Sequence, residues 1–380
     1  MTGSDDTKMT EPAGTEGTDR ITIRQVHARA YRIPTDWPEA DGTLEWNDTT
    51  LILAEVHAGD ITGIGYTYGN AAIATVITGA LAEAINGRNI LDIPSVHTAM
   101  KRHIRNEGHA GLAMMALSAV DCALWDAKAK LLAVPLYKLL GRVRKELRIY
   151  GSGGFTGYTD KQLEWQLSGW KEAGIKDMKI KVGRDPARDI ERVRQARQII
   201  GDGSGLFVDA NGAYTCQQAL QQAVAFNQAG VSWLEEPVSS DDLTGLNFIR
   251  QRTPAGMRVA AGEYGYDLVY FRRMLAAGAV DVLQADATRC GGITGFINAG
   301  RLCEAYGVPF SSHCAPTLHM QAALSLPSFF IAEYFHDHVR IESMLFEGCP
   351  GPRGGVLVPD PDLPGLGIVF RYADAKKYMI

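Results

Sequence analysis

Ionisable residues recur at the ends of short apolar segments in the second half of the chain. From Lys181 onward, consecutive members of this set lie 20 to 28 residues apart, which is the length of one strand followed by one helix. Without a function, seven consecutive strand ends with ionisable groups would be hard to stabilise, because their carboxylates would repel one another. The members are Lys179, Lys181, Asp209, Glu235, Glu263, Asp286, His313 and Glu333.

Three carboxylates of this set, Asp209, Glu235 and Glu263, follow neighbouring segments and are expected to face one site. Converging carboxylates need a counter-cation, and ligation by oxygen alone favours Mg²⁺ over Zn²⁺, which prefers histidine and cysteine. The alternative is that each acid caps a helix or lies on the surface by itself. The spacing predicts a metal site with Mg²⁺ as the cofactor.

Two lysines and one histidine are the candidate bases. Lys179 and Lys181 are two residues apart, so on a strand both face the same side, and two such ammonium groups are expected to lower each other's pKa. Asp286 and His313 end adjacent segments, where a hydrogen bond would orient the imidazole and raise its basicity. The alternatives are an edge strand with solvated lysines and a histidine with a structural role.

The elements that would position these residues are eight apolar segments that alternate with amphipathic ones between residues 147 and 340. This alternation predicts an α/β fold with a parallel (β/α)₈ barrel, and the first segment lacks the G-x-G-x-x-G of a dinucleotide-binding sheet. Residues 21–146 read as strands followed by helices, which predicts an α+β capping domain. Residues 1–20 are a polar, acidic tail, and 341–380 are expected to return to the capping domain.

A Trp-, Pro- and Gly-rich segment, DWPEADGTLEWND, separates the first two predicted strands and is expected to be a long loop. Trp37 and Trp46 in it are candidate substrate-binding residues, or they pack the capping domain. Arg289 is a third candidate, as an anion contact near a helix N-terminus or as a support of the barrel mouth. The polar residues that this loop offers to a hydrophilic substrate are Glu39, Asp41, Glu45, Asn47 and Asp48.

The composition excludes several other classes of protein. The 380 residues include 38 basic and 43 acidic ones, a net charge of −5, so no nucleic-acid partner is expected. No apolar run approaches the roughly 18 residues that span a bilayer, and the N-terminus lacks signal-peptide order, so no membrane partner is expected. Six scattered cysteines without a C-x-x-C pair favour a reducing cytoplasm.

Several motifs resemble those of the enolase superfamily, mandelate racemase subgroup. They are KIKVG, VDANG, LEEP, AGE, DATRCGG, the SSH before Cys314, and Glu333, and they occur in family-like order and spacing. Muconate-lactonising relatives carry a lysine at the end of the sixth barrel strand, where this chain has Asp286, which favours the mandelate racemase branch. The resemblance implies a modified enolase-type barrel whose capping domain combines the N-terminal region with the C-terminal segment.

The resemblance also implies a role for each candidate residue. The three carboxylates would bind Mg²⁺, which chelates a substrate carboxylate and stabilises an enediolate as the α-proton leaves. Lys181 would be the base on one face of the α-carbon, and His313, supported by Asp286, the base or acid on the other. Lys179 would neutralise the substrate carboxylate, and Glu333 would hydrogen-bond an enediolate oxygen.

The reaction that follows proton abstraction is expected to be loss of water from a sugar acid, giving a 2-keto-3-deoxy acid. The alternatives are a racemase or epimerase of a 2-hydroxy acid, or a cycloisomerase, on the same site. A metal-dependent hydrolase would want histidines in the metal shell, and a third alternative is a non-enzymatic sugar-acid binder. The resemblance further implies a small-molecule carboxylate substrate and a homo-oligomer.

Overall fold

The computed structural model describes residues 21–380, so the predicted tail 1–20 lies outside the described residues. The chain begins with an antiparallel sheet of β1 (Ile23–Ala40), β2 (Glu45–Ala58) and β3 (Ile61–Tyr68), in the order β1-β2-β3. A Cβ on Gly63 would lie 2.1 Å from the carbonyl oxygen of Ala123. The missing side chain therefore lets β3 lie directly on helix α4 (Met114–Leu131).

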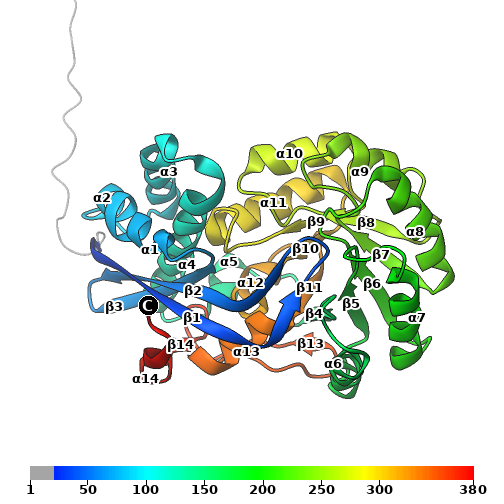
Figure 1. Ribbon diagram of the computed structural model, residues 1–380. Coiled ribbons are helices and arrows are strands. Elements are labelled where there is room, and N and C mark those ends of the chain that lie inside the picture. Colours follow the sequence, from blue (N-terminus) through cyan, green and yellow to red (C-terminus); the bar gives the residue numbers. More distant parts are fainter. Residues whose placement is uncertain (1–20) are drawn as a thin grey trace, which may run out of the picture.

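Short helices complete the capping part beside this sheet (Figure 1). Their apolar residues form a core with the sheet that contains Ile52, Val56, Ile77 and Leu117. The helices are α1 (Ala72–Val76), η1 (Ile77–Leu81), α2 (Ala82–Ile85), α3 (Ile93–His103), η2 (Ile104–Asn106) and η3 (His109–Ala113). Helix α5 (Leu136–Leu140) follows α4, and its buried residues belong to the other large core cluster, which includes the barrel.

Eight further strands close into a parallel barrel, because β11 pairs with both β10 and β4. Each of the eight predicted apolar segments contains one strand, which confirms the barrel prediction. The strands are β4 (Leu147–Gly153), β5 (Asp177–Lys181), β6 (Gly205–Asp209), β7 (Val231–Glu235), β8 (Arg258–Ala261), β9 (Val282–Ala285), β10 (Phe310–Ser312) and β11 (Phe329–Phe335).

Helices surround the barrel, and capping residues mark where two of them begin. Thr159 and Thr215 each form a capping box at the start of a helix, which satisfies backbone N–H groups that have no partner in the first turn. The helices are α6 (Asp160–Glu172), α7 (Asp189–Ile200), α8 (Cys216–Gln228), α9 (Leu243–Arg250), α10 (Leu268–Ala276), α11 (Gly292–Tyr306), α12 (Pro316–Ala323) and α13 (His336–Leu345).

An aromatic layer fills the barrel interior below the strand ends. The rings of Phe207 and Trp233 stack with centroids 5.1 Å apart, and Tyr150 packs against both. These three side chains are buried with Ala260, Val282 and Ile331 in one cluster. The barrel is therefore filled on this side, and polar groups are left to the carboxyl ends of its strands.

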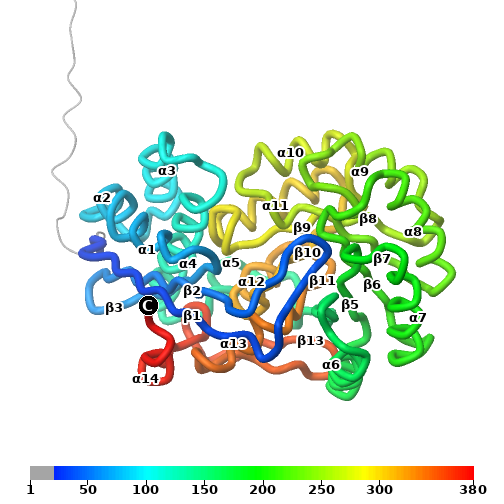
Figure 2. The backbone as a smooth tube through the Cα atoms, in the orientation of Figure 1, coloured from blue at the N-terminus to red at the C-terminus, as the bar shows by residue number. Residues whose placement is uncertain are grey.

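The segment expected to be a long loop is instead a β-hairpin, so that expectation is wrong. β1 and β2 pair up to Pro34 and Asp48, shift register, and pair again at Glu39–Trp46 and Ala40–Glu45, so that only residues 41–44 turn. The hairpin tip reaches the barrel (Figure 2), where the N–H of Thr156 donates to Ala40 O at 2.8 Å. A Cβ on Gly42 would lie 2.5 Å from Ala210 O, so the tip is in direct contact with the loop after β6.

The C-terminal segment contacts both parts of the molecule. Leu357 pairs with Leu147 at the start of β4, and the N–H of Ile380 donates to Ala30 O at 3.1 Å. Its elements are β12 (Phe346–Glu347), β13 (Val356–Leu357), β14 (Val369–Phe370), α14 (Tyr372–Ala375) and η4 (Lys376–Tyr378). The domain boundaries placed after residues 146 and 340 stay predictions.

Within residues 21–380, one helical segment, His109–Leu131, is long and apolar enough to cross a membrane by length and composition. This corrects the expectation that no run approaches that length. The mean hydropathy of its most apolar stretch is 1.3, but 72% of that stretch is buried inside the protein, where α4 packs on β3 and β2. Such burial is typical of a core helix, so the segment is weak evidence for a membrane span.

Candidate active site

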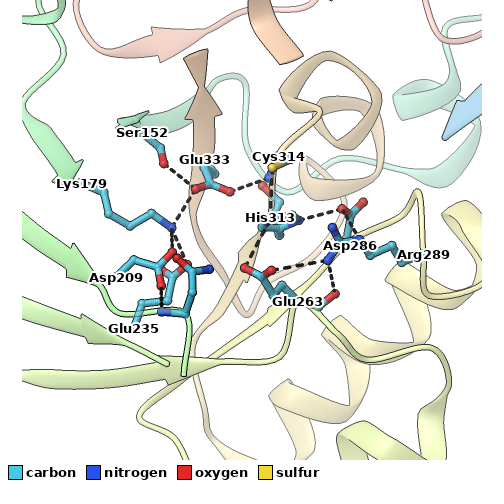
Figure 3. Close-up of polar contacts among 12 residues, drawn as sticks. Ser152, Lys179, Asp209, Glu235, Glu263, Asp286, Arg289, His313, Cys314 and Glu333 are labelled. Atoms are coloured by element: carbon cyan, nitrogen blue, oxygen red, sulfur yellow. Dashed lines mark hydrogen bonds and ion pairs between the residues drawn. The ribbon is translucent and has the colours of Figure 1, made fainter. Parts of the chain in front are cut away.

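The eight candidate residues of the barrel all lie within the last residues of a strand or one to two residues beyond its end. All eight are buried, and Figure 3 shows most of them around one centre. Buried charges require partners, because removal from water penalises the ionised form. The structure therefore brings the whole barrel set together, as expected from the strand-end spacing.

The three candidate metal ligands converge. One carboxylate oxygen each from Asp209, Glu235 and Glu263 lie within 4.8 Å of one another. Glu235 Oε2 accepts a 2.8 Å hydrogen bond from Trp233 Nε1, and Glu263 Oε2 is buried without a hydrogen bond. A buried oxygen that accepts no hydrogen bond, in a set made of carboxylates alone, suits a hard cation such as Mg²⁺, so the residues fit the predicted metal.

Both lysines point into this carboxylate cluster. Lys179 Nζ contacts Glu235, lies 2.7 Å from Glu333 Oε1 and is 3.5 Å from Asp209 Oδ2. Lys181 Nζ lies 2.5 Å from Asp209 Oδ2. Burial lowers the pKa of each lysine, but the carboxylates outweigh it and hold both pKa values above the usual range. Lys179 does lower the pKa of Lys181, as expected, but the net shift is upward because four acids surround the two lysines.

A histidine–aspartate pair faces the cluster from the opposite flank. His313 Nδ1 lies 2.8 Å from Asp286 Oδ2, and His313 Nε2 lies 3.3 Å from Glu263 Oε2. Burial raises the pKa of Asp286, but His313, His319 and Arg289 outweigh it and hold that pKa well below its usual range. For His313, burial lowers the pKa, while Glu263 and Asp286 raise it, and the net shift is upward.

Glu333 connects the two flanks. Its Oε1 accepts a 2.6 Å hydrogen bond from Ser152 Oγ, and its Oε2 accepts one of 2.6 Å from the backbone N–H of Cys314. Burial raises the pKa of Glu333, but Lys179 and His313 hold it below the usual range. Glu333 is thus an ionised acceptor between the lysine side and the histidine side.

Two contributors to the site were not singled out from the sequence. Cys314 Sγ lies 3.1 Å from His313 Nε2, and Cys314 adopts a left-handed backbone with a φ of 52°. Ser152 comes from β4, whose apolar segment ends without an ionisable residue. Ser152 lies two residues after Tyr150 on one strand, so both side chains face the same side, and this spacing could have identified Ser152. Nothing in the sequence indicates the left-handed backbone at Cys314.

The three candidate substrate-binding residues occupy different surroundings. Trp46 packs on Phe155, and Trp37 packs on Tyr158 and Trp165, each edge to face. Both tryptophans are only partly buried and lie against the cluster that includes Cys314 and Phe335.

Arg289, the third candidate, lies 3.5 Å from Glu263 Oε1 and 3.8 Å from Asp286 Oδ2. Its guanidinium also covers the Tyr264 ring at 5.2 Å. These contacts agree with the alternative role of Arg289, in which it supports the barrel mouth. That Arg289 binds substrate stays a prediction.

Two family models match the chain. The mandelate racemase/muconate lactonizing enzyme N-terminal domain matches residues 23–141, and the enolase C-terminal domain-like model matches residues 162–375. Among curated relatives, the 3,6-anhydro-α-L-galactonate cycloisomerase of Streptomyces coelicolor is 32% identical over 92% of this chain and 97% of its own. The arabinonate dehydratase of Saccharolobus solfataricus is 30% identical over 71% and 74%.

Solved structures agree with this relationship. A mandelate racemase/muconate lactonizing enzyme-like protein from Rubrobacter xylanophilus superposes with a TM-score of 0.92 at 49% identity, covering 94% of this chain and all of the other. A racemase from Streptomyces coelicolor A3(2) with bound magnesium gives a TM-score of 0.88 at 30% identity, over 94% and 100%. The cofactor prediction is thereby confirmed as Mg²⁺. The chain belongs to the mandelate racemase/muconate lactonizing enzyme family of the enolase superfamily and is a Mg²⁺-dependent enzyme.

Proposed function

We propose that the protein is an acid-sugar dehydratase, which removes water from a sugar acid to give a 2-keto-3-deoxy acid. The observation that carries this proposal is the placement of two proton-transfer groups on opposite flanks of the carboxylate cluster. Lys181 lies on the Asp209 side at 2.5 Å, and His313 lies on the Glu263 side at 3.3 Å. One group can remove a proton while the other delivers one.

Three carboxylates, Asp209, Glu235 and Glu263, would hold Mg²⁺, which when bound polarises the substrate carboxylate and stabilises the charge that develops as the α-proton leaves. Lys181 takes the α-proton. His313 gives its Nε2 proton to the departing β-hydroxyl, so the C–O bond breaks and water leaves. The resulting enol tautomerises to the 2-keto acid, which balances the reaction without any further reactant.

Lys179 and Glu333 position the reacting groups in this proposal. Both are fully buried and 2.7 Å apart, and Lys179 also contacts two of the proposed metal ligands, Asp209 and Glu235. We propose that Lys179 neutralises the substrate carboxylate. We propose further that Glu333, an ionised acceptor in this structure, takes up a proton when substrate binds and donates it in a hydrogen bond to an enediolate oxygen. These roles rest on the family resemblance together with the observed contacts.

The test is a panel of aldonates and aldarates incubated with the Mg²⁺-loaded enzyme and assayed for 2-keto acid. Turnover of at least one member, lost in Lys181→Ala and His313→Asn, is the expected result. If Mg²⁺ binds but no member of the panel is dehydrated, the dehydratase proposal is wrong. The relative named arabinonate dehydratase makes pentonates the first substrates to assay.

A cycloisomerase is the second candidate, because the Streptomyces coelicolor relative that is 32% identical to this chain carries that name. The same two proton-transfer groups would serve it, with a ring oxygen in place of a hydroxyl as the leaving group. Its product has the same mass as its substrate, so mass spectrometry separates it from dehydration. Incorporation of solvent deuterium at C2 without either product would instead identify a racemase or epimerase.

The cellular location and the oligomeric state of the enzyme are also proposals. All six cysteines are unpaired, as suits a reducing compartment, which supports the cytoplasm as its location. A homo-oligomer, suggested by the family resemblance, stays a prediction that light scattering would check.

A further inference from the structure

A second group of side chains that could bind a metal ion lies where the hairpin meets the barrel. Asp36 and Glu39 come from β1, and His336 is the first residue of α13, directly after β11. One possible ligand atom from each of the three residues lies within 4.8 Å of the other two. We call these three residues the seam cluster. It contains none of the candidate catalytic residues.

In the seam cluster, Glu39 has a buried carboxylate oxygen without a hydrogen-bond partner. Its side chain is fully buried, its Oε2 accepts a 2.8 Å hydrogen bond from Trp46 Nε1, and its Oε1 makes no hydrogen bond. A buried carboxyl group with an unused oxygen is costly unless a donor or a cation satisfies it.

The neighbouring charges do not supply that partner. His336 Nε2 lies 2.8 Å from Asp36 Oδ2, which leaves Glu39 outside the pair. Arg340 donates to Asp337 Oδ1 at 2.6 Å and to the carbonyl oxygen of Pro34 at 2.7 Å. The described surroundings of Glu39 are therefore net acidic, with the one nearby guanidinium already engaged.

We propose that Asp36, Glu39 and His336 form a second metal site that binds a first-row transition-metal dication such as Zn²⁺. One imidazole and two carboxylates are a common ligand set for such ions, and water would complete the shell. The barrel site, with oxygen ligands alone, differs in this respect and prefers Mg²⁺. Binding would replace the hydrogen bond between Asp36 and His336.

This second site joins parts of the chain that are 300 residues apart in sequence, since Asp36 and His336 are its outer members. The cation would fasten the capping hairpin to the end of the last barrel strand. Trp37, between the two acidic ligands, already packs on Tyr158 and Trp165 of the barrel part. The inference does not rest on the proposed dehydratase reaction, and its test needs no substrate.

Co²⁺ is the probe for the experiment, because its visible absorption reports nitrogen and oxygen ligation directly. Enzyme saturated with Mg²⁺ is titrated with Co²⁺, and the bound metals are counted after gel filtration. We expect one Co²⁺ per chain in addition to Mg²⁺. We expect Glu39→Gln and His336→Gln, which keep the size and polarity of the side chains, to weaken Co²⁺ binding at least tenfold.

Matched variants separate this site from its neighbours. Asp48→Asn, which changes an exposed acid of the same hairpin paired with Arg32 at 3.7 Å, should bind Co²⁺ as the parent does. Glu263→Gln should lose Mg²⁺ but keep Co²⁺. Absence of a second metal, unchanged binding in both seam variants, or loss of Co²⁺ with Glu263→Gln would each overturn the proposal. If Glu39→Gln fails to fold, Asp36→Asn at an exposed position decides the question in the same way.

Discussion

The imidazole of His313 is held by Asp286, with 2.8 Å between Nδ1 and Oδ2. The other oxygen of Asp286 accepts a 2.7 Å hydrogen bond from the N–H of Thr288. His319 lies behind the pair and accepts from the N–H of Ala287 at 2.7 Å. Because an ionised carboxylate only accepts, His313 carries a proton on Nδ1, and its Nε2 faces Glu263 and the reaction centre.

Asp286→Asn should lower kcat by about 10² to 10⁴, the usual contribution of general acid–base catalysis, because the orienting carboxylate of the catalytic histidine is replaced by an amide. The amide would leave the shape of the site intact but would permit the wrong tautomer of His313. Steady-state kinetics on a turned-over sugar acid, with Mg²⁺ affinity measured in parallel, checks this. Mg²⁺ affinity should stay unchanged, and an equal loss of both quantities would contradict a role through His313.

Trp233→Phe should weaken Mg²⁺ binding about 10- to 100-fold, as is typical when a partner of a metal ligand is lost. The indole Nε1 donates to Glu235 Oε2 at 2.8 Å, so it fixes the orientation of a proposed ligand. Phenylalanine keeps an aromatic ring beside Phe207 and removes the donor, together with part of the buried ring volume. The Mg²⁺ dependence of activity is the measurement, and Trp165→Phe, at a tryptophan with 58% of its surface exposed, is the control.

Gly42→Ala should push the hairpin tip away from the barrel mouth. Its Cβ would lie 2.5 Å from Ala210 O and 2.8 Å from Val182 O, and both are backbone atoms that cannot turn aside. We expect a loss of about 1 to 3 kcal/mol in the free energy of unfolding, the usual cost of overpacking, and a higher KM. Gly79→Ala, where nothing lies within 4 Å of the new methyl group, should leave both unchanged or raise stability slightly.

The strand ends of the barrel were predictable because two independent regularities agree there. The spacing between ionisable residues equals one strand–helix unit, and the alternation of Lys179 and Lys181 with apolar residues places both inside the barrel. Local sequence therefore determines which side chains meet at the mouth. Their distances in the structure follow from closure of the barrel, which brings β11 beside β4.

Other features depend on tertiary contacts that no local pattern encodes. The segment around Trp37 and Trp46 has the composition of a loop, yet both tryptophans find aromatic partners on the barrel, which stabilises the paired strands. The lysine pKa values follow from how many carboxylates surround them, which depends on the final geometry. The seam cluster likewise joins residues from opposite ends of the chain.

Glu342→Gln should reduce the loss of stability that the protein suffers as pH rises from about 5 to 7. Burial raises the pKa of Glu342 to about 7, although Thr317 and Tyr66 donate to it, and Tyr66 Oη lies 2.6 Å from Oε1. The unfolded chain releases this proton near the ordinary glutamate pKa of 4.5, so between pH 4.5 and about 7 the folded state binds more protons.

The stability supplied by protonated Glu342 is therefore fully present below pH 4.5 and is lost as pH rises through about 7. The slope is at most about 1.4 kcal/mol per pH unit from this one group. Urea unfolding at pH 5, 6 and 7 should show the parent losing stability relative to Glu342→Gln, whose amide can still accept from Tyr66. Glu347→Gln, at a side chain 67% exposed, should follow the parent at every pH. Parallel curves for the parent and Glu342→Gln would show that the buried carboxyl does not titrate in this range.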